Sequence, residues 1–201
     1  MSGTVMTVAL VQIPRKKQVF ALCCGLLGCL CFGVGDWLML YGDPTHTGSL
    51  YWLTEGVAQM VPWRFTLAMA LAFPGIVLYG TALFSLEALI NAEKPRRIYR
   101  TLTTYSLTPW LCLHLLYILI LFAYGWLRAS DYAQMANPVC EAIFAQFSWL
   151  PLVSEVLMVP PYLYWFYLQV SGKTALPKPL AFANVLVFYA ALYGVKSLLP
   201  I

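Results

Sequence analysis

Long apolar stretches separated by short polar segments dominate the hydrophobic pattern of this chain. A helix that crosses the ~30 Å hydrocarbon core of a bilayer needs about 20 mostly apolar residues, and four stretches reach that length. A further segment, residues 139–170, is too long for one straight crossing, and either Pro151 or the Pro160-Pro161 pair could break it. The pattern predicts an all-α, polytopic membrane protein, a single domain whose five transmembrane helices lie at about residues 18–41, 64–91, 101–127, 152–170 and 179–199.

Two shorter segments have a different, amphipathic pattern. Residues 50–61 carry Glu55 and Gln59 among apolar positions at helical spacing, which is typical of a helix lying on a membrane surface. We expect this segment to lie on the external face or to dip into the membrane as a lid. If the fourth apolar segment breaks at Pro151, residues 139–150 form a second, partly embedded amphipathic piece.

Positive charges are distributed unevenly among the loops. Lys and Arg near the ends of spans stay on the cytoplasmic side, and nine of the twelve basic residues precede predicted span one, or lie between spans two and three or spans four and five: Arg15, Lys16, Lys17, Lys94, Arg96, Arg97, Arg100, Lys173 and Lys178. This bias predicts a cytoplasmic N-terminus and an external C-terminus. Glu87, near the cytoplasmic end of span two, is expected to pair with one of the basic residues at 94–97.

The composition agrees with a location in a cell membrane, the cytoplasmic membrane if the protein is bacterial. The chain is 61% hydrophobic and 10% charged, whereas soluble domains are about 25% charged. Such a chain cannot clothe a soluble surface, which disfavours a nucleic-acid-binding protein, a secreted disulfide scaffold and a cytosolic enzyme, and makes the lipid bilayer the expected partner. Its six cysteines lack the paired spacing of zinc sites, so neither a metal nor a cofactor is expected.

Two ionisable residues lie near the predicted outer ends of the first two spans. Asp36 is close to the end of the first and Arg64 opens the second, so they should lie at similar depth and form a charge-assisted pair. That pair either locks the two helices together or makes Arg64 an anchor for an anion or carboxylate.

Two further polar residues lie deeper. His114 is midway along the third span, on a face that also carries Trp110 and Tyr117, and Glu155 lies in the fourth. Ionisable groups at such depth persist only with a partner or a role. Either residue could merely hydrogen-bond a neighbouring helix, but together they could also carry a proton or act as general acid and base.

The depths of these residues predict a pocket that opens outward. Its outer layer holds Asp36, Arg64 and Glu141, with His114 and Glu155 beneath it as the candidate catalytic residues. Aromatic side chains would contact the apolar part of a ligand: Trp37, Trp63, Trp110, Tyr117 and Tyr79. We expect Pro74-Gly75, halfway along the second span, to kink that helix and help to form the cavity.

Short motifs in residues 20–90 resemble a family. Gly35-Asp36-Trp37-Leu38-Met39-Leu40-Tyr41 is similar to the Gly-Asp-x-Leu-x-x-Tyr end of the first helix in an uncharacterised bacterial family of integral membrane proteins, a domain of unknown function. Trp63-Arg64 matches the Arg that opens its second helix, and Leu78-Tyr79-Gly80 its later Tyr/Gly, whereas Pro74-Gly75 reverses its Gly-Pro order. The resemblance implies that Asp36 and Arg64 pair throughout that family, and it implies no activity.

A second likeness is one of design. A five-helix bundle with acids, a histidine and tryptophans in a membrane cavity resembles the emopamil-binding-protein type of sterol isomerase, although no motif of that group is present. This likeness favours isomerisation slightly.

Three functions stay open at this point. In the first, the pocket binds a lipid-like small molecule and either only holds it or transforms it, for example by isomerisation. In the second, the protein is a proton-coupled transporter of a small solute, for which five helices would require a homodimer. In the third it is a non-catalytic assembly subunit, which docks through a stripe of small residues in the first span: Ala21, Gly25, Cys29 and Gly33.

Overall fold

The computed structural model describes residues 14–40 and 61–198 of the chain. Every element in these ranges is helical, as expected: α1 (Arg15–Leu40), α3 (Pro62–Ser85), the 3₁₀ helix η1 (Leu86–Leu89), α4 (Glu93–Arg128), η2 (Ala133–Met135), α5 (Ala136–Phe147), α6 (Leu150–Val170), η3 (Lys178–Ala183) and α7 (Val185–Leu198). The predicted amphipathic segment around Glu55 and Gln59 lies outside the described residues, apart from its last position.

Within these ranges, three helices are long and apolar enough to cross a membrane: α1, α3 together with η1, and α4. A fourth crossing is obtained if η2–α5 and α6, which meet at a bend of 44°, form one broken span. The coarse prediction of a membrane protein with several apolar helices is therefore supported. By contrast α7 has 14 residues, which at 1.5 Å per residue is shorter than the ~30 Å hydrocarbon core, so the fifth span stays a prediction.

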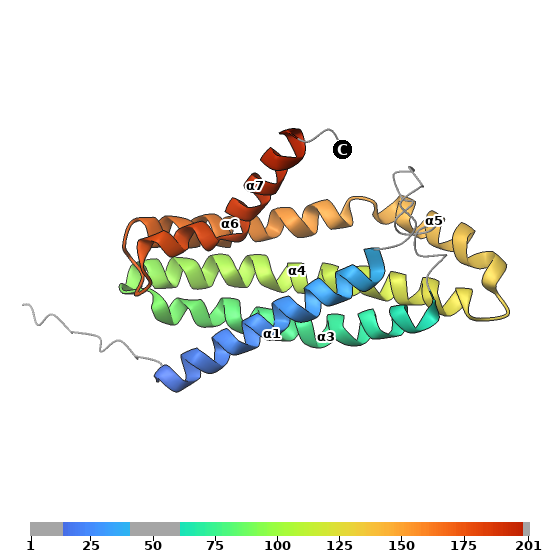
Figure 1. Cartoon of the computed structure of the whole chain (residues 1–201), viewed down its shortest axis with the longest axis horizontal. Coiled ribbons are helices and arrows are strands. Elements are labelled where there is room, and N and C mark those ends of the chain that lie inside the picture. Colours follow the sequence, from blue (N-terminus) through green and yellow to red (C-terminus); the bar gives the residue numbers. More distant parts are fainter. Residues whose placement is uncertain (1–13, 41–60, 199–201) are drawn as a thin grey trace, which may run out of the picture.

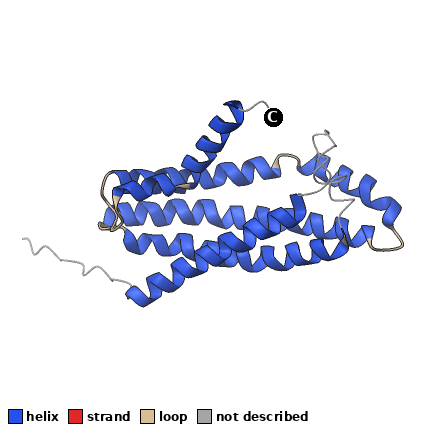
Figure 2. Ribbon diagram, in the orientation of Figure 1, coloured by secondary structure: helices blue, strands red, loops and turns tan. Residues whose placement is uncertain are grey.

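The long helices form an elongated bundle. α3, α4 and α6 run lengthwise beside one another, α1 crosses them obliquely, and α7 leaves the bundle at an angle (Figures 1 and 2). α1 packs mainly on α3, and α4 packs on both α3 and α6. The bundle core therefore lies where α3, α4 and α6 meet, with α1 laid across α3.

Small residues permit the close contact between α1 and α3. A Cβ added at Gly28 would lie 2.7 Å from the Tyr79 nitrogen, and one at Gly25 would lie 2.5 Å from Ala82 Cβ. A Cβ at Gly33 would meet nothing within 4 Å. The predicted small-residue stripe is thus a packing face, but it contacts a helix of the same chain and follows Gly25 and Gly28 rather than Gly33. This removes the argument that it docks another protein.

The fourth apolar segment breaks before Pro151. α5 ends at Phe147 and α6 begins at Leu150, so the proline occupies the first turn of the new helix, where its missing N–H costs nothing. α6 then continues through Pro160 and Pro161. The break at Pro151, one of the two options left open by the sequence, is the one the structure has. α3 likewise continues through Pro74 as one helix.

The predicted span at 179–199 is divided in two by Asn184. This residue has extended backbone angles between η3 and α7, and its Oδ1 accepts a 3.0 Å hydrogen bond from the backbone nitrogen of Leu186. Its Nδ2 donates a 3.0 Å hydrogen bond to the carbonyl oxygen of Tyr162. Asn184 is thus the N-cap of α7 and ties that helix to α6.

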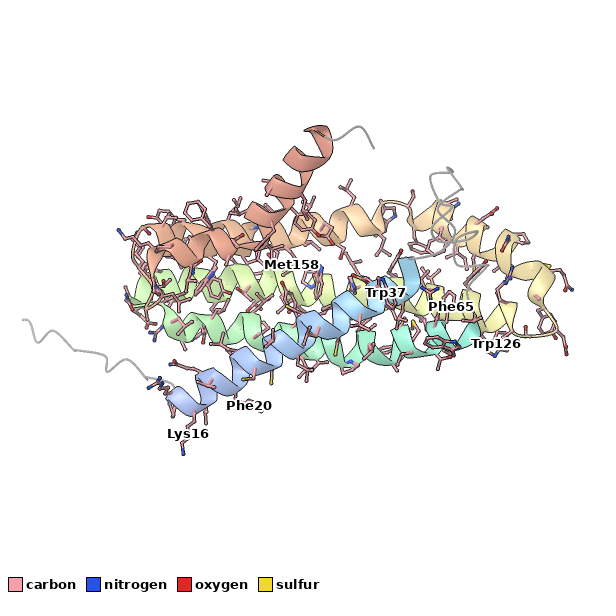
Figure 3. The ribbon with its side chains drawn as sticks, in the orientation of Figure 1. Lys16, Phe20, Trp37, Phe65, Trp126 and Met158 are labelled. Atoms are coloured by element: carbon pink, nitrogen blue, oxygen red, sulfur yellow. The ribbon has the colours of Figure 1, made fainter. Side chains whose placement is uncertain are left out.

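The basic loops meet at one end of the bundle. The loop after η1 pairs with the loop after α6, since Asn91 N donates to Lys173 O at 3.0 Å and Ala175 N to Leu89 O at 2.8 Å. Lys16, at the start of α1, lies toward the same end, whereas Trp126 lies at the other (Figure 3). Glu87 does pair with a basic residue there, but the partner is Arg100, about one helical turn beyond the expected partners at 94–97, with 2.7 Å between Arg100 Nε and Glu87 Oε2.

Candidate functional site

A cavity of about 240 Å³ lies among α1, α3, α4, α6 and the beginning of α7. We call it the His114 cavity. Its lining residues come from all five helices: Cys29, Phe32, Asp36, Tyr79, Trp110, His114, Glu155, Met158, Tyr162, Val185 and Tyr189. Met158 marks its position along α6 in Figure 3. Sites built between facing helices of a bundle are common because each helix contributes side chains at the same level.

Three ionisable side chains reach this cavity from three different helices. Asp36 comes from near the end of α1, His114 from the middle of α4 and Glu155 from the second turn of α6. Neither carboxylate has a hydrogen bond or an ion pair within residues 14–40 and 61–198. Both side chains are exposed. They therefore remain available to a ligand or to water.

Aromatic rings hold the His114 imidazole. Its ring centroid lies 4.8 Å from that of Trp110, with the planes 30° apart, and 5.5 Å from that of Phe32 in an edge-to-face arrangement. Across the described part of the chain no hydrogen bond reaches its ring nitrogens. A neutral imidazole carries one donor and one acceptor nitrogen, so His114 can exchange a proton with an occupant of the cavity.

Two tyrosines form one wall of the cavity. The hydroxyl groups of Tyr79 on α3 and Tyr162 on α6 are hydrogen-bonded to each other. The Tyr79 ring also lies 5.7 Å from Phe32 and 6.0 Å from Trp110, centroid to centroid. The wall therefore belongs to the same aromatic cluster that holds His114.

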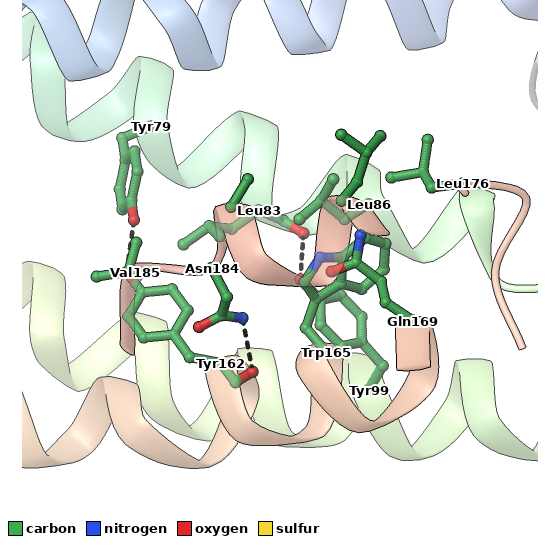
Figure 4. A pocket seen from close by; sticks show the side chains of 12 residues that line it. Tyr79, Leu83, Leu86, Tyr99, Tyr162, Trp165, Gln169, Leu176, Asn184 and Val185 are labelled. Atoms are coloured by element: carbon green, nitrogen blue, oxygen red, sulfur yellow. Dashed lines mark hydrogen bonds between the residues drawn. The ribbon is translucent and has the colours of Figure 1, made fainter. Parts of the chain in front are cut away.

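A second cavity, of about 280 Å³, lies on the other side of this wall (Figure 4). We call it the Gln169 cavity. It is lined by Tyr79, Leu83, Leu86, Tyr99, Tyr162, Trp165, Gln169, Leu176, Leu180, Ala183, Asn184 and Val185. The Tyr99 hydroxyl donates a 2.9 Å hydrogen bond to the Leu83 carbonyl oxygen. Since this bond already occupies the hydroxyl proton, the lining of the Gln169 cavity is largely apolar.

The structure brings five of the predicted site residues together, Tyr79 of the cavity wall among them, and separates the other five. Asp36, Trp110, His114 and Glu155 line the His114 cavity, and Arg64, Trp37, Trp63, Tyr117 and Glu141 do not. Trp37 and Trp63 are 58% and 60% exposed, because neighbours of Asp36 and Arg64 on a helix point about 100° away from them.

The expected pair between Asp36 and Arg64 is not among the ion pairs of the described residues. Arg64 Nη2 instead lies 3.5 Å from the Trp37 carbonyl oxygen. Tyr117, although only three positions after His114, packs against Phe144 of α5 at 6.1 Å. The ionisable side chains that line the His114 cavity are therefore two acids and a histidine, without the expected arginine.

The sequence interpretation missed Tyr162, Tyr189 and Cys29 as cavity residues. Tyr162 follows two prolines inside an unbroken apolar run, and nothing in that run distinguishes its hydroxyl from those of Tyr164 and Tyr167. Tyr189 lies in α7, whose start is decided by the Asn184 cap. A signal for that cap was present, because asparagine directly before an apolar run favours a helix N-terminus.

Comparison with known families is consistent with the sequence motifs. A family model described as a family of unknown function (DUF6796) matches residues 12–200. The chain belongs to this family. The match confirms the expected membership in a domain-of-unknown-function family and extends it from residues 20–90 to nearly the whole chain. Searches of the curated proteins and of the solved structures each found no match.

Proposed function

We propose that this member of the DUF6796 family is a multi-pass membrane protein that binds a lipid-like small molecule in the His114 cavity and transforms it by proton transfer. The observation that carries the proposal is the convergence of Asp36, His114 and Glu155, from three helices, on one aromatic-lined cavity. A concave, mostly apolar site with a few convergent polar groups is typical of small-molecule binding.

Proton transfer requires a donor and an acceptor that both reach the same ligand. His114 and Glu155 reach the cavity from two different helices, α4 and α6. One can remove a proton while the other returns one at a second position, which is the chemistry of an isomerisation. Asp36 completes the polar part of the site and orients the ligand.

The same proposal includes a topology with five crossings. Nine basic residues lie at the start of α1, in the first turns of α4 and between the end of α6 and the start of η3. These segments gather at one end of the bundle (Figure 1). By the positive-inside rule that end is cytoplasmic, so the N-terminus is cytoplasmic and the C-terminus external. Asp36 and Glu155 then lie in the outer half of the membrane, in a cell membrane of the host.

Native mass spectrometry of the protein released from maltoside micelles tests binding. We expect the wild type and Asp131→Asn, whose exposed carboxyl group lines neither cavity, to retain a lipid-like molecule. Val185→Phe narrows the His114 cavity and should lose it. Thermal unfolding of each variant shows whether it is folded. A wild type without retained mass, or a folded Val185→Phe variant that retains it equally, would refute the binding site.

Incubation in deuterated water tests the chemistry. Proton transfer through His114 and Glu155 should place deuterium on carbon in the retained molecule, and His114→Ala should retain the molecule without deuterium. Any molecule that Glu155→Gln retains should likewise carry no deuterium. The same measurement separates this function from proton-coupled transport, in which the molecule crosses unchanged. Equal labelling in either variant removes that residue from the mechanism.

A further inference from the structure

The two cavities are neighbours along the bundle and share part of their walls. Tyr79, Tyr162 and Val185 line both. The hydrogen bond between the two tyrosine hydroxyl groups closes the boundary, so side chains rather than backbone separate the cavities. Alone, each is smaller than the about 300–1,000 Å³ that is usual for small-molecule sites. Joined, they fall within that range.

Polarity changes sharply from one cavity to the other. The His114 cavity holds Asp36, Glu155 and an imidazole. The residues that line the Gln169 cavity include no Asp, Glu, Lys, Arg or His. A site that is ionisable at one end and neutral and apolar at the other matches an amphiphile, with its head in the first cavity and its chain in the second.

The lining charges determine the sign of that head. Two carboxyl groups line the His114 cavity and no Lys or Arg does. Carboxylates within the membrane persist with a partner of opposite charge, and neither Asp36 nor Glu155 has one among the residues that the structure describes. The faces of Trp110 and Tyr79, which line the same space, also attract cations. An organic cation complements all of these groups.

Gln169 supplies an independent indication of an occupant. The residue is 2% exposed and lines this cavity, and its side-chain amide has no hydrogen-bond partner in the described ranges. The amide atoms are not fully enclosed by protein, so they border the space of the cavity. Buried amides are nearly always hydrogen-bonded to protein, water or ligand. Figure 4 shows this amide among the side chains that line the Gln169 cavity. The cavity therefore has an unused polar group that an occupant can satisfy.

We propose that the two cavities form one site for a long-chain amphiphile with a cationic head, a protonated amine or a quaternary ammonium. The head lies between Asp36 and Glu155, and the chain passes between Tyr79 and Tyr162, which separate, into the Gln169 cavity. This inference rests on the proposed binding function and adds to it the charge of the head and the path of the chain.

Photolabelling with three matched probes tests the inference. Each has a decyl chain with a terminal diazirine, and the heads are trimethylammonium, hydroxyl and sulfate. With the full-length protein in maltoside micelles, we expect the cationic probe to label saturably at a concentration at least tenfold below that of the other two. Peptide mapping should place its label on residues of the Gln169 cavity. The inference would be overturned if the sulfate or alcohol probe reached half-saturation at the same concentration as the cationic probe. It would also be overturned if the label lay only on residues outside the two cavities.

Three variants identify the groups responsible. Asp36→Asn and Glu155→Gln should each reduce the preference for the cation by tenfold or more, whereas Asp131→Asn, an exposed acid away from both cavities, should keep it. Leu180→Trp fills the Gln169 cavity. Leu180 is half-exposed, so the larger indole can be accommodated without disturbing the core. Leu180→Trp should abolish labelling of the Gln169 cavity. Trimethylphenylammonium, which has a cationic head but no chain, should still compete with the cationic probe for the site between Asp36 and Glu155.

The outcomes separate this inference from the function on which it rests. If no probe labels saturably, the binding function itself fails. If the alcohol or sulfate probe labels the Gln169 cavity as well as the cation does, binding stands and the cationic head is refuted. If the cation is preferred but Leu180→Trp leaves labelling of the Gln169 cavity unchanged, the path of the chain is wrong.

Discussion

Replacing Gly28 by alanine should separate α1 from α3 and disturb the His114 cavity. The added Cβ would lie 2.7 Å from the Tyr79 nitrogen and 3.0 Å from the Gly75 carbonyl oxygen. Both contacts are with backbone, which cannot turn aside as a side chain would. The two helices must therefore move apart, and the backbone of Tyr79, whose ring forms part of the cavity wall, must move with them.

Two opposing effects set the magnitude. Overpacking a close helix contact costs about 1–3 kcal/mol, and replacing a helical glycine by alanine recovers about 0.5–1 kcal/mol. The net expectation for Gly28→Ala is a loss of about 1–2 kcal/mol in the free energy of unfolding. Gly33→Ala is the matched control on the same helix, because its Cβ would meet nothing within 4 Å. It should be neutral or gain up to about 1 kcal/mol.

Equilibrium unfolding in mixed maltoside and dodecyl sulfate micelles, followed by circular dichroism, measures both variants at one protein concentration. Retention of the lipid-like molecule by native mass spectrometry gives a second measure, which Gly28→Ala should weaken and Gly33→Ala should leave unchanged. A Gly28→Ala variant as stable as Gly33→Ala would refute the close packing of α1 on α3.

Three further predictions concern single contacts. Asn184→Ala removes the N-cap of α7 and its bond to α6, and should cost about 1–2 kcal/mol in thermal or chemical unfolding, while Asn184→Asp, which keeps the cap acceptor, should lose less. Tyr124→Phe removes the 2.9 Å hydrogen bond to Asn137 that joins α4 to α5; we expect a loss of about 0.5–1.5 kcal/mol, and no loss would show that this bond is replaced by water. Glu87→Gln breaks the exposed pair with Arg100 and should cost less than about 1 kcal/mol, an effect that must shrink as salt is added.

Much of the fold follows from local properties of the chain. Apolar runs of sufficient length specify the positions of α1, α3, α4 and α6, because burial of an apolar helix in lipid depends on length and composition alone. The polar start of α4, from Glu93, precedes its apolar run and lies outside the predicted span. Pro151 marks the division of the fourth segment for an equally local reason, since proline is tolerated in the first turn of a helix. Helix caps are weaker signals, and Asn184 divided a run that hydropathy alone treats as continuous.

The site was only partly predictable. Ionisable residues at membrane depth are rare and costly, so Asp36, His114 and Glu155 were identifiable without a structure, and all three line one cavity. Their partners were not. Whether Arg64 or Tyr162 joins them depends on the rotation of each helix about its own axis. Tertiary packing decides that rotation, because a helix that is about equally apolar on every side carries no sequence signal for it.

In this protein the amino-acid sequence by itself determined an all-α chain with several membrane-crossing helices and a short set of polar residues at depth. Only the tertiary structure decided that Gly28 brings α1 against Tyr79, that Tyr79 meets Tyr162, and that this pair separates an acidic cavity from a neutral one. The physical reason is range. Hydropathy and helix formation act along neighbouring residues, whereas a cavity is formed by side chains far apart in the chain, whose meeting depends on how whole helices pack.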